Sequence, residues 1–110
     1  MSFISRKKEY SMYLNIKLRA INPNKNVNRV YNIKMDNDLF NSYSVITERG
    51  RYGKPLLPKI EKFTNETNLK QFLKKNLKKR LNAAKRIGCD YKIIKKKYSQ
   101  EFKDILAEVA

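Results

Sequence analysis

Apolar and polar residues alternate along the first third of the chain, which is the pattern of strands with one buried face. From Met12 to Ala20 every second residue is apolar, and the residues between them are Tyr, Asn, Lys and Arg. In Arg29–Met35 the apolar positions again share one face. Turn-forming residues at 22–26 separate the two runs. The pattern therefore predicts two neighbouring strands.

Two further strands are predicted before residue 64. The run Leu39–Arg49 is mixed, but Tyr43, Val45 and Thr47 share the face that Arg49 continues. The prolines at 55 and 58 argue against a strand interior before Lys59–Phe63. Because no helical pattern separates these strands, the sequence predicts an antiparallel sheet.

A long helix is predicted next, with Asn65 as its N-cap and Gly88 just after its last turn. At about 100° per residue the apolar residues fall within one arc. They are Leu69, Phe72, Leu73, Leu77, Leu81 and Ala84. Asn76 and Arg80 fall inside the same arc. Either the helix overhangs the sheet there, which we favour, or Arg80 reaches a buried partner.

The last twenty residues predict two short elements. Residues 91–94 form a final short strand, and 95–97 form a solvated basic bridge. Ser99 then caps a helix with one apolar face. The fold class is thus α+β: a small twisted antiparallel sheet packed on one long amphipathic helix, plus a short C-terminal helix. We expect a basic flexible arm over 1–10, a domain over 11–94 and a helical extension over 95–110.

Positive charge dominates the composition and points to a polyanionic partner. Lys and Arg total 26 against 10 Asp and Glu, for a net charge of +16 among 110 residues. No acidic residue occurs between Leu69 and Arg86, so the outer face of the helix carries a basic stripe. The partner classes that this charge indicates are DNA, RNA, an acidic membrane surface and an acidic protein.

Missing residue types exclude several kinds of chemistry. The chain has no His and a single cysteine, Cys89, which excludes a Cys/His zinc site, His-based catalysis and an internal disulfide. No apolar run approaches the roughly 18 residues of a membrane span. The first nine residues lack the apolar core of a signal peptide. We therefore expect no enzyme activity, cofactor, metal or membrane contact, and a cytoplasmic location. The oligomeric state stays open.

The stretch Val45–Gly53 turns a strand into a tight basic turn. Alternation places Arg49 and Arg51 on one face, where two guanidiniums can grip a phosphate or a carboxylate. A hairpin turn with solvated arginines explains the spacing equally well. Gly50 and Gly53 suit positive φ or a close approach of another backbone.

In the order of these elements the chain resembles a WGR domain, a family named for a Trp-Gly-Arg motif. The family occurs in poly(ADP-ribose) polymerases and in stand-alone bacterial proteins. The resemblance covers about residues 18–94. It is carried by the segments Asn26–Tyr31, Leu39–Val45, Arg49–Gly53, Phe63 with the helix from Asn65, and Lys85–Tyr91.

One position departs from the family motif, because Arg49 replaces the signature tryptophan. In poly(ADP-ribose) polymerases that tryptophan packs against the terminal nucleotide of a DNA break. An arginine can instead stack on a base or pair with a phosphate. The intact Gly50 and Arg51 complete the motif, and by position Arg51 is expected to make a structural or DNA-backbone contact.

The resemblance and the charge together predict a non-enzymatic nucleic-acid-binding module, for DNA before RNA, with phosphate contacts and weak sequence specificity. The predicted nucleic-acid contacts are Arg49, Arg51, Lys54, Lys70, Lys74, Lys75, Lys78, Lys79, Lys85 and Arg86. The predicted structural residues of the motif are Arg29, Tyr31, Gly50, Gly53 and Tyr91.

Several alternatives remain open. The chain can be a protein–protein adaptor that uses the WGR-like surface or the apolar face of the last helix. Tyr43 and Tyr52 are either stacking platforms or, as we favour, half-buried strand residues. Arg29 is either a brace to Asp36 or Asp38, which we favour, or a phosphate contact.

Overall fold

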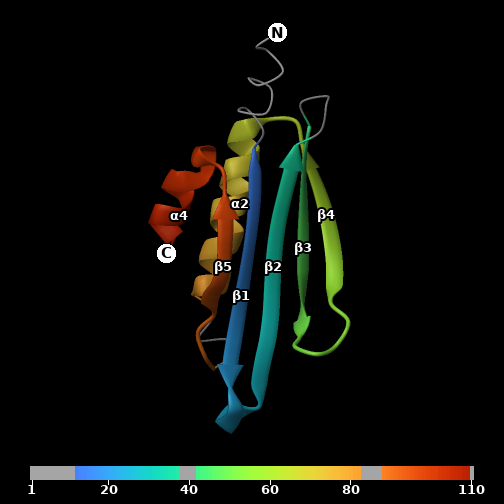
Figure 1. Cartoon of the computed structure of the whole chain (residues 1–110), viewed down its shortest axis with the longest axis vertical. Coiled ribbons are helices and arrows are strands. Elements are labelled where there is room, and N and C mark those ends of the chain that lie inside the picture. The colour runs from blue at the N-terminus through green and yellow to red at the C-terminus, as the bar shows by residue number, and fades with distance from the viewer. Residues whose placement is uncertain (1–11, 38–41, 83–87, 110) are drawn as a thin grey trace.

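A five-stranded antiparallel sheet forms the frame of the molecule, with strand order β4-β3-β2-β1-β5. The computed structural model describes residues 12–37, 42–82 and 88–109. The strands are β1 (Tyr13–Asn22), β2 (Val27–Asn37), β3 (Tyr43–Arg51), β4 (Leu57–Phe63) and β5 (Lys92–Tyr98), and the short helix η1 (Pro23–Lys25) joins the first two. The helix α2 (Glu66–Leu81) covers one face of the sheet, and α4 (Lys103–Val109) lies beside it at the β5 edge (Figure 1). The predicted α+β class is confirmed.

The core lies between α2 and one face of the sheet. The central strands β1 and β2 pair over their whole length, with Leu18 opposite Tyr31 and Ile16 opposite Ile33. Paired residues of an antiparallel sheet point to the same face. All four of these side chains are buried, so the alternation in the sequence determines which face the helix covers. The opposite face of the sheet, which we call the open face, is turned toward the viewer in Figure 1.

The helix α2 begins where the sequence predicts it. The side-chain oxygen of Asn65 accepts a hydrogen bond of 3.1 Å from the backbone N–H of Asn68, as an N-cap does. Leu69, Leu73 and Leu77 are fully buried against the sheet. The predicted end at Gly88 is wrong, because α2 ends at Leu81 with Asn82 in a non-helical conformation.

The two edge strands, β4 and β5, extend beyond their predicted limits into residues that disfavour a central strand. β4 contains Pro58, which a strand with a free edge tolerates because no neighbour needs the missing N–H. β5 includes the three lysines of the predicted basic bridge, so that bridge is wrong. An exposed edge favours lysine, because its charge discourages pairing with another chain. Opposite Lys17 and Leu18 the register of β5 shifts by one residue, which leaves Ile94 as the extra residue of a β-bulge.

The C-terminal segment packs on the same core. After β5 the chain forms η2 (Gln100–Phe102) and then α4. Phe102, Ile105 and Leu106 are buried, which confirms the predicted apolar face. Ser99 makes no side-chain cap; its hydroxyl instead accepts from the backbone N–H of Tyr13 at 3.1 Å. The division of the chain at residue 94 stays a prediction, and the predicted arm 1–10 lies outside the described residues.

Because Phe102 is buried in the core, we predict that the C-terminal segment contributes to the stability of the whole domain. Its ring is fully inaccessible to solvent, so the substitution Phe102→Ala should lower the free energy of unfolding by about 3–5 kcal/mol. Chemical denaturation monitored by circular dichroism measures this change. The neighbouring exposed Lys103 provides the control, because Lys103→Ala should change stability by less than about 0.5 kcal/mol. If the two substitutions changed the free energy of unfolding equally, packing of Phe102 would not be what stabilises the domain.

Candidate nucleic-acid interface

The glycines of the WGR-like turn are required by its geometry. The turn between β3 and β4 is closed by a hydrogen bond of 3.1 Å from the N–H of Lys54 to the carbonyl of Arg51. Gly53 has φ of 84°, a backbone conformation that residues other than glycine rarely adopt. A Cβ on Gly50 would lie 3.2 Å from Cδ2 of Leu56, so the missing side chain lets Leu56 fold back over the strand.

Arg49 lies on the side of the sheet that α2 covers. It is opposite the buried Tyr31 in the register of β2 and β3. A polar cavity of about 120 Å³ lies there between the sheet and the C-terminal half of α2. We call it the helix-side pocket, and its charged lining is Arg49, Lys59, Glu61, Lys79 and Arg80. The pocket therefore brings the arginine of the hairpin together with the basic helix.

Arg80 reaches a buried partner, so the overhang that we favoured from the sequence is wrong. Its guanidinium carbon lies 4.5 Å from the centroid of the Tyr31 ring. In the described part of the chain its buried Nε has no hydrogen-bond partner. Burial raises the pKa of Tyr31, and the positive charge of Arg80 beside the phenol partly offsets this rise. Asn76, the other polar residue in the apolar arc, donates its side-chain N–H to the carbonyl of Phe72 at 2.9 Å.

Arg51 makes a structural contact at the far end of the sheet. Its guanidinium donates to the backbone oxygen of Asn26 at 3.1 Å and to the side-chain oxygen of the same residue at 2.9 Å. Asn26 has φ of 54°, so this fork holds the left-handed residue that ends η1. Arg29 lies opposite Arg51. The predicted brace from Arg29 to Asp36 is wrong, because seven positions along one strand separate them by about 23 Å; Asp38 lies outside the described residues.

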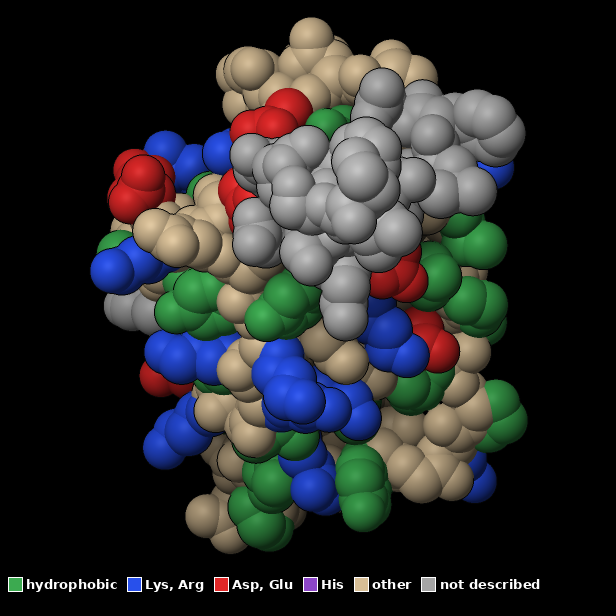
Figure 2. Space-filling view, turned by 45° about the horizontal axis from the view of Figure 1, so that its top comes forward, with side chains coloured by type: hydrophobic (Ala, Val, Ile, Leu, Met, Phe, Trp, Pro, Cys, Tyr) green, Lys and Arg blue, Asp and Glu red, His purple; other side chains and the backbone are tan. Residues whose placement is uncertain are grey.

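Lys54 lies on the open face, away from the helix-side pocket. It lines a groove together with Lys17, Arg19 and Tyr52. The guanidinium carbon of Arg19 lies 3.6 Å from the centroid of the Tyr52 ring. Tyr52 is thus an exposed, stacked residue, which corrects the half-buried interpretation. Tyr43 is half-buried and packs against the core, as predicted. Figure 2 looks obliquely onto this face and shows Lys and Arg side chains gathered below its centre.

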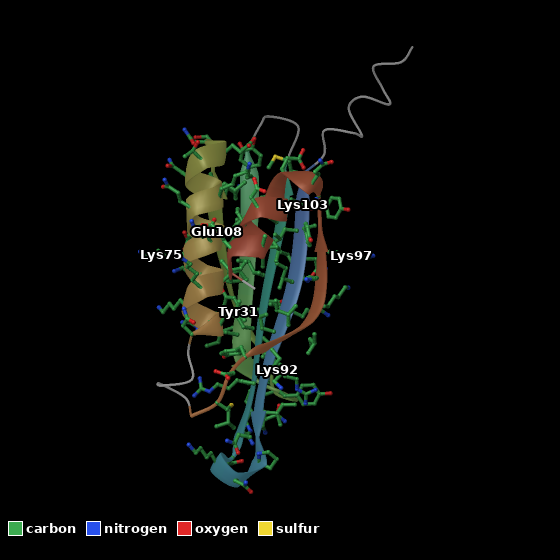
Figure 3. The ribbon with its side chains drawn as sticks, turned by 90° about the vertical axis from the view of Figure 1, so that its left-hand side faces the viewer. Tyr31, Lys75, Lys92, Lys97, Lys103 and Glu108 are labelled. Carbon is green, nitrogen blue, oxygen red and sulfur yellow. The ribbon has the colours of Figure 1, made fainter. Side chains whose placement is uncertain are left out.

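The predicted lysines of α2 differ in their surroundings. Lys75 and Lys78 are exposed, and Lys75 points away from the sheet in Figure 3. Lys70 pairs with Glu66 at 3.1 Å, and Lys74 with Glu108 at 2.8 Å. The hydrogen bond from Lys74 lowers the pKa of the Glu108 carboxyl. Such solvent-exposed ion pairs are weak, so a phosphate can replace either carboxylate. Lys85 and Arg86 lie outside the described residues.

Sequence reasoning predicted Lys54 but missed the other basic residues of the groove on the open face, Lys17 and Arg19. Lys17 and Arg19 alternate with the core residues of β1, so the pattern already placed them on the outer face. Their approach to Tyr52 depends on the turn folding back over β2, where the N–H of Tyr52 donates to the carbonyl of Asn28 at 2.9 Å. No local pattern in the sequence encodes that contact.

The buried phenol of Tyr31 gives a prediction about alkaline pH. In the unfolded chain Tyr31 titrates near its ordinary pKa of 10.0, and burial raises this pKa in the folded state. The folded state therefore holds the phenol proton more tightly. The resulting stability is fully present below about pH 10 and is lost as the pH rises through the folded-state pKa.

Tyr31→Phe should remove this part of the pH dependence. Urea denaturation at several pH values from about 9 to about 11 measures the slope of the unfolding free energy. The slope should be shallower in Tyr31→Phe than in the unaltered protein, and unchanged in Tyr13→Phe, whose ring is 48% exposed. The same slope in both variants would show that burial of Tyr31 does not perturb its titration.

Comparison with known proteins agrees with the geometry of the turn and the sheet. A model of the WGR domain family matches residues 14–88, which is more than half of the chain. No curated protein matches the chain. None of the helices in the described residues combines the length and apolar composition that a membrane-spanning helix needs. Within those residues, no three of the side chains His, Cys, Asp and Glu gather as metal ligands would. The chain belongs to the WGR domain family, whose members are in general nucleic-acid-binding modules and not catalysts.

Proposed function

We propose that this protein is a non-enzymatic module that binds nucleic acid through the phosphate backbone, with DNA preferred over RNA and weak sequence specificity. The observation that carries the proposal is the outer face of α2, whose lysines continue to Arg49 of the WGR-like turn. The lone thiol of Cys89, half-buried and with no second cysteine in the sequence, supports our assignment to a reducing cytoplasm.

The arrangement of charge supports phosphate contacts. From Leu69 to Leu81 the helix α2 has no carboxylate of its own. Lys75 and Lys78 project into solvent, while Lys79 and Arg49 line the same pocket. Positive charge thus extends from the helix to Arg49, where four cationic side chains and one carboxylate, Glu61, line the pocket, and this excess favours a polyanion lying across both.

The chemistry of this surface supports weak sequence specificity. Lysine is a flexible point charge, and a contact with phosphate positions a protein on DNA without reading bases. The preference for DNA rests on the WGR resemblance. At the signature position, Arg49 offers a planar cation that can stack on a terminal base or pair with its phosphate.

The adaptor hypothesis receives no support from the described residues. One form of it uses the last helix and needs a free apolar face there, but Phe102, Ile105 and Leu106 are buried against the core of the same chain. The other form, in which an acidic protein binds the basic WGR-like surface, would depend on the same lysines.

Replacing Lys75 and Lys78 by Gln, singly and together, should weaken duplex binding and reduce its salt dependence. On B-DNA each lost phosphate contact should reduce the slope of log K against log salt by about 0.9. Fluorescence anisotropy on blunt, nicked and single-stranded oligonucleotides at two or more salt concentrations measures both quantities. Lys103→Gln removes the same charge from the exposed side of α4 and is the matched control.

Two results would contradict the proposal. One is the absence of duplex binding near about 100 mM salt, where six or more phosphate contacts should still give measurable affinity. The other is an equal loss of affinity in Lys75→Gln and Lys103→Gln, which would show that only the net charge matters.

A further inference from the structure

A groove on the open face combines apolar, aromatic and basic side chains, whereas a surface that binds only phosphate needs just the basic ones. It has a volume of about 290 Å³ and lies on the side of the sheet opposite α2, between β1, β2, β5 and the β3–β4 turn. Val30, Leu56 and Ile94 supply apolar surface, and Lys17, Arg19 and Lys54 supply positive charge. Among the described residues, none of those that line it is acidic. We call it the open-face groove; blue and green side chains lie together in this region of Figure 2.

One wall of the open-face groove is a rigid planar platform. Arg19 stacks on the Tyr52 ring at 3.6 Å, and its Nε also donates to the side-chain oxygen of Asn28 at 3.2 Å. This bond fixes the plane of the guanidinium, while the Tyr52 ring stays 54% exposed. A flat ligand can stack on this pair without first ordering two flexible side chains.

A buried amide adds hydrogen-bonding groups to the same groove. Asn32 lines the groove, although the residue is only 8% exposed. In the described part of the chain its side-chain oxygen has no hydrogen-bond partner. A buried hydrogen-bond acceptor without a partner destabilises the fold and is uncommon, so we expect the amide of Asn32 to bond to a ligand outside the chain. An amide offers both a donor and an acceptor, the combination that pairs with the edge of a nucleobase.

We propose that the open-face groove binds one unpaired nucleotide of a single-stranded nucleic acid. The base stacks on the Tyr52–Arg19 pair and contacts the apolar surface, and its edge bonds to the amide of Asn32. Lys17 and Lys54 hold the phosphates on either side. The volume suits one base and its sugar. A base inside a duplex cannot enter, because both of its faces are covered by its neighbours.

The chemistry favours a nucleotide over an acidic peptide. Both would satisfy the lysines, but a carboxylate side chain uses neither the planar platform nor the apolar surface. A base uses both, and stacking on an aromatic side chain is the common means by which proteins hold unpaired bases.

This inference goes beyond the proposed function, because the open-face groove and the outer face of α2 lie on opposite sides of the molecule. Lys75 on α2 and Lys97 on β5 point outward in opposite directions in Figure 3. A protein with both surfaces can hold a duplex with one and an unpaired strand with the other.

The test uses the full chain and fluorescein-labelled oligo-dT, oligo-dA, oligo-rU and oligo-rA of about 12 nucleotides, together with a duplex of the same length. Tyr52→Leu keeps the apolar bulk but removes the stacking ring. It should weaken binding of single strands by about 5- to 100-fold and leave duplex binding unchanged. Tyr13→Leu is the matched control, because Tyr13 lies on the same face with similar exposure but outside the groove.

A second variant and a second measurement test the buried amide. Asn32→Leu keeps the volume of the side chain and removes its unpartnered oxygen, so the protein should stay folded, as thermal denaturation checks. Its affinity for single strands should fall several-fold. In the unaltered protein the NMR signal of the Asn32 side-chain amide should shift when oligo-dA or oligo-dT is added.

The outcomes for the two surfaces are separable. Lys75→Gln with Lys78→Gln should weaken duplex binding and spare strand binding, the reverse of Tyr52→Leu. Equal strand affinity in Tyr52→Leu and Tyr13→Leu would overturn the open-face groove while leaving the proposed function intact. Displacement of the strand by oligo-glutamate at equal charge would also overturn it. Tighter binding of the DNA or the RNA strands would identify the natural source of the nucleotide.

Discussion

The packing of α2 on one face of a fully antiparallel sheet is the constraint on which the rest of the structure depends. Leu69, Leu73 and Leu77 have no access to solvent, and the strand residues beneath them are equally inaccessible. Because side chains alternate along a strand, this contact also decides which residues of each strand face water. The helix therefore determines the position of side chains that it never touches, including Lys17 and Arg19 on the open face.

A sheet covered on one side gives the molecule two chemically different basic surfaces. On the covered side, positive charge comes from a helix and from Arg49, and it surrounds a small polar pocket. On the open side, positive charge comes from strands and is mixed with aromatic and apolar side chains. The excess charge that the composition reveals is thus divided between two faces, and the predicted contacts do not form one continuous patch: Arg49 belongs to the first face and Lys54 to the second.

The sequence predicts the fold well wherever one periodic pattern decides the structure. Alternation located β1 and β2, and Asn65 marked the start of α2, because these signals are local. The edge strands were predicted too short, because proline and lysine disfavour a central strand but not an edge. Arg80 was misjudged because its partner, Tyr31, lies far away in the sequence. The site was only partly predicted for the same reason: the turn carries Tyr52 back to Arg19, and local spacing does not encode that approach.

The β-bulge at Ile94 has a consequence for the lengths that homologous chains can tolerate. Before the bulge Ile93 lies opposite the buried Leu18, and after it Lys95 lies opposite the outward-facing Lys17. If β5 kept Ile94 but paired regularly with β1, every position after Ile94 would change sides, which would turn Lys95 and Lys97 inward and Tyr98 outward. A relative that is one residue shorter here can therefore form a regular strand with the same residues on each side, whereas a relative of the same length must keep the bulge.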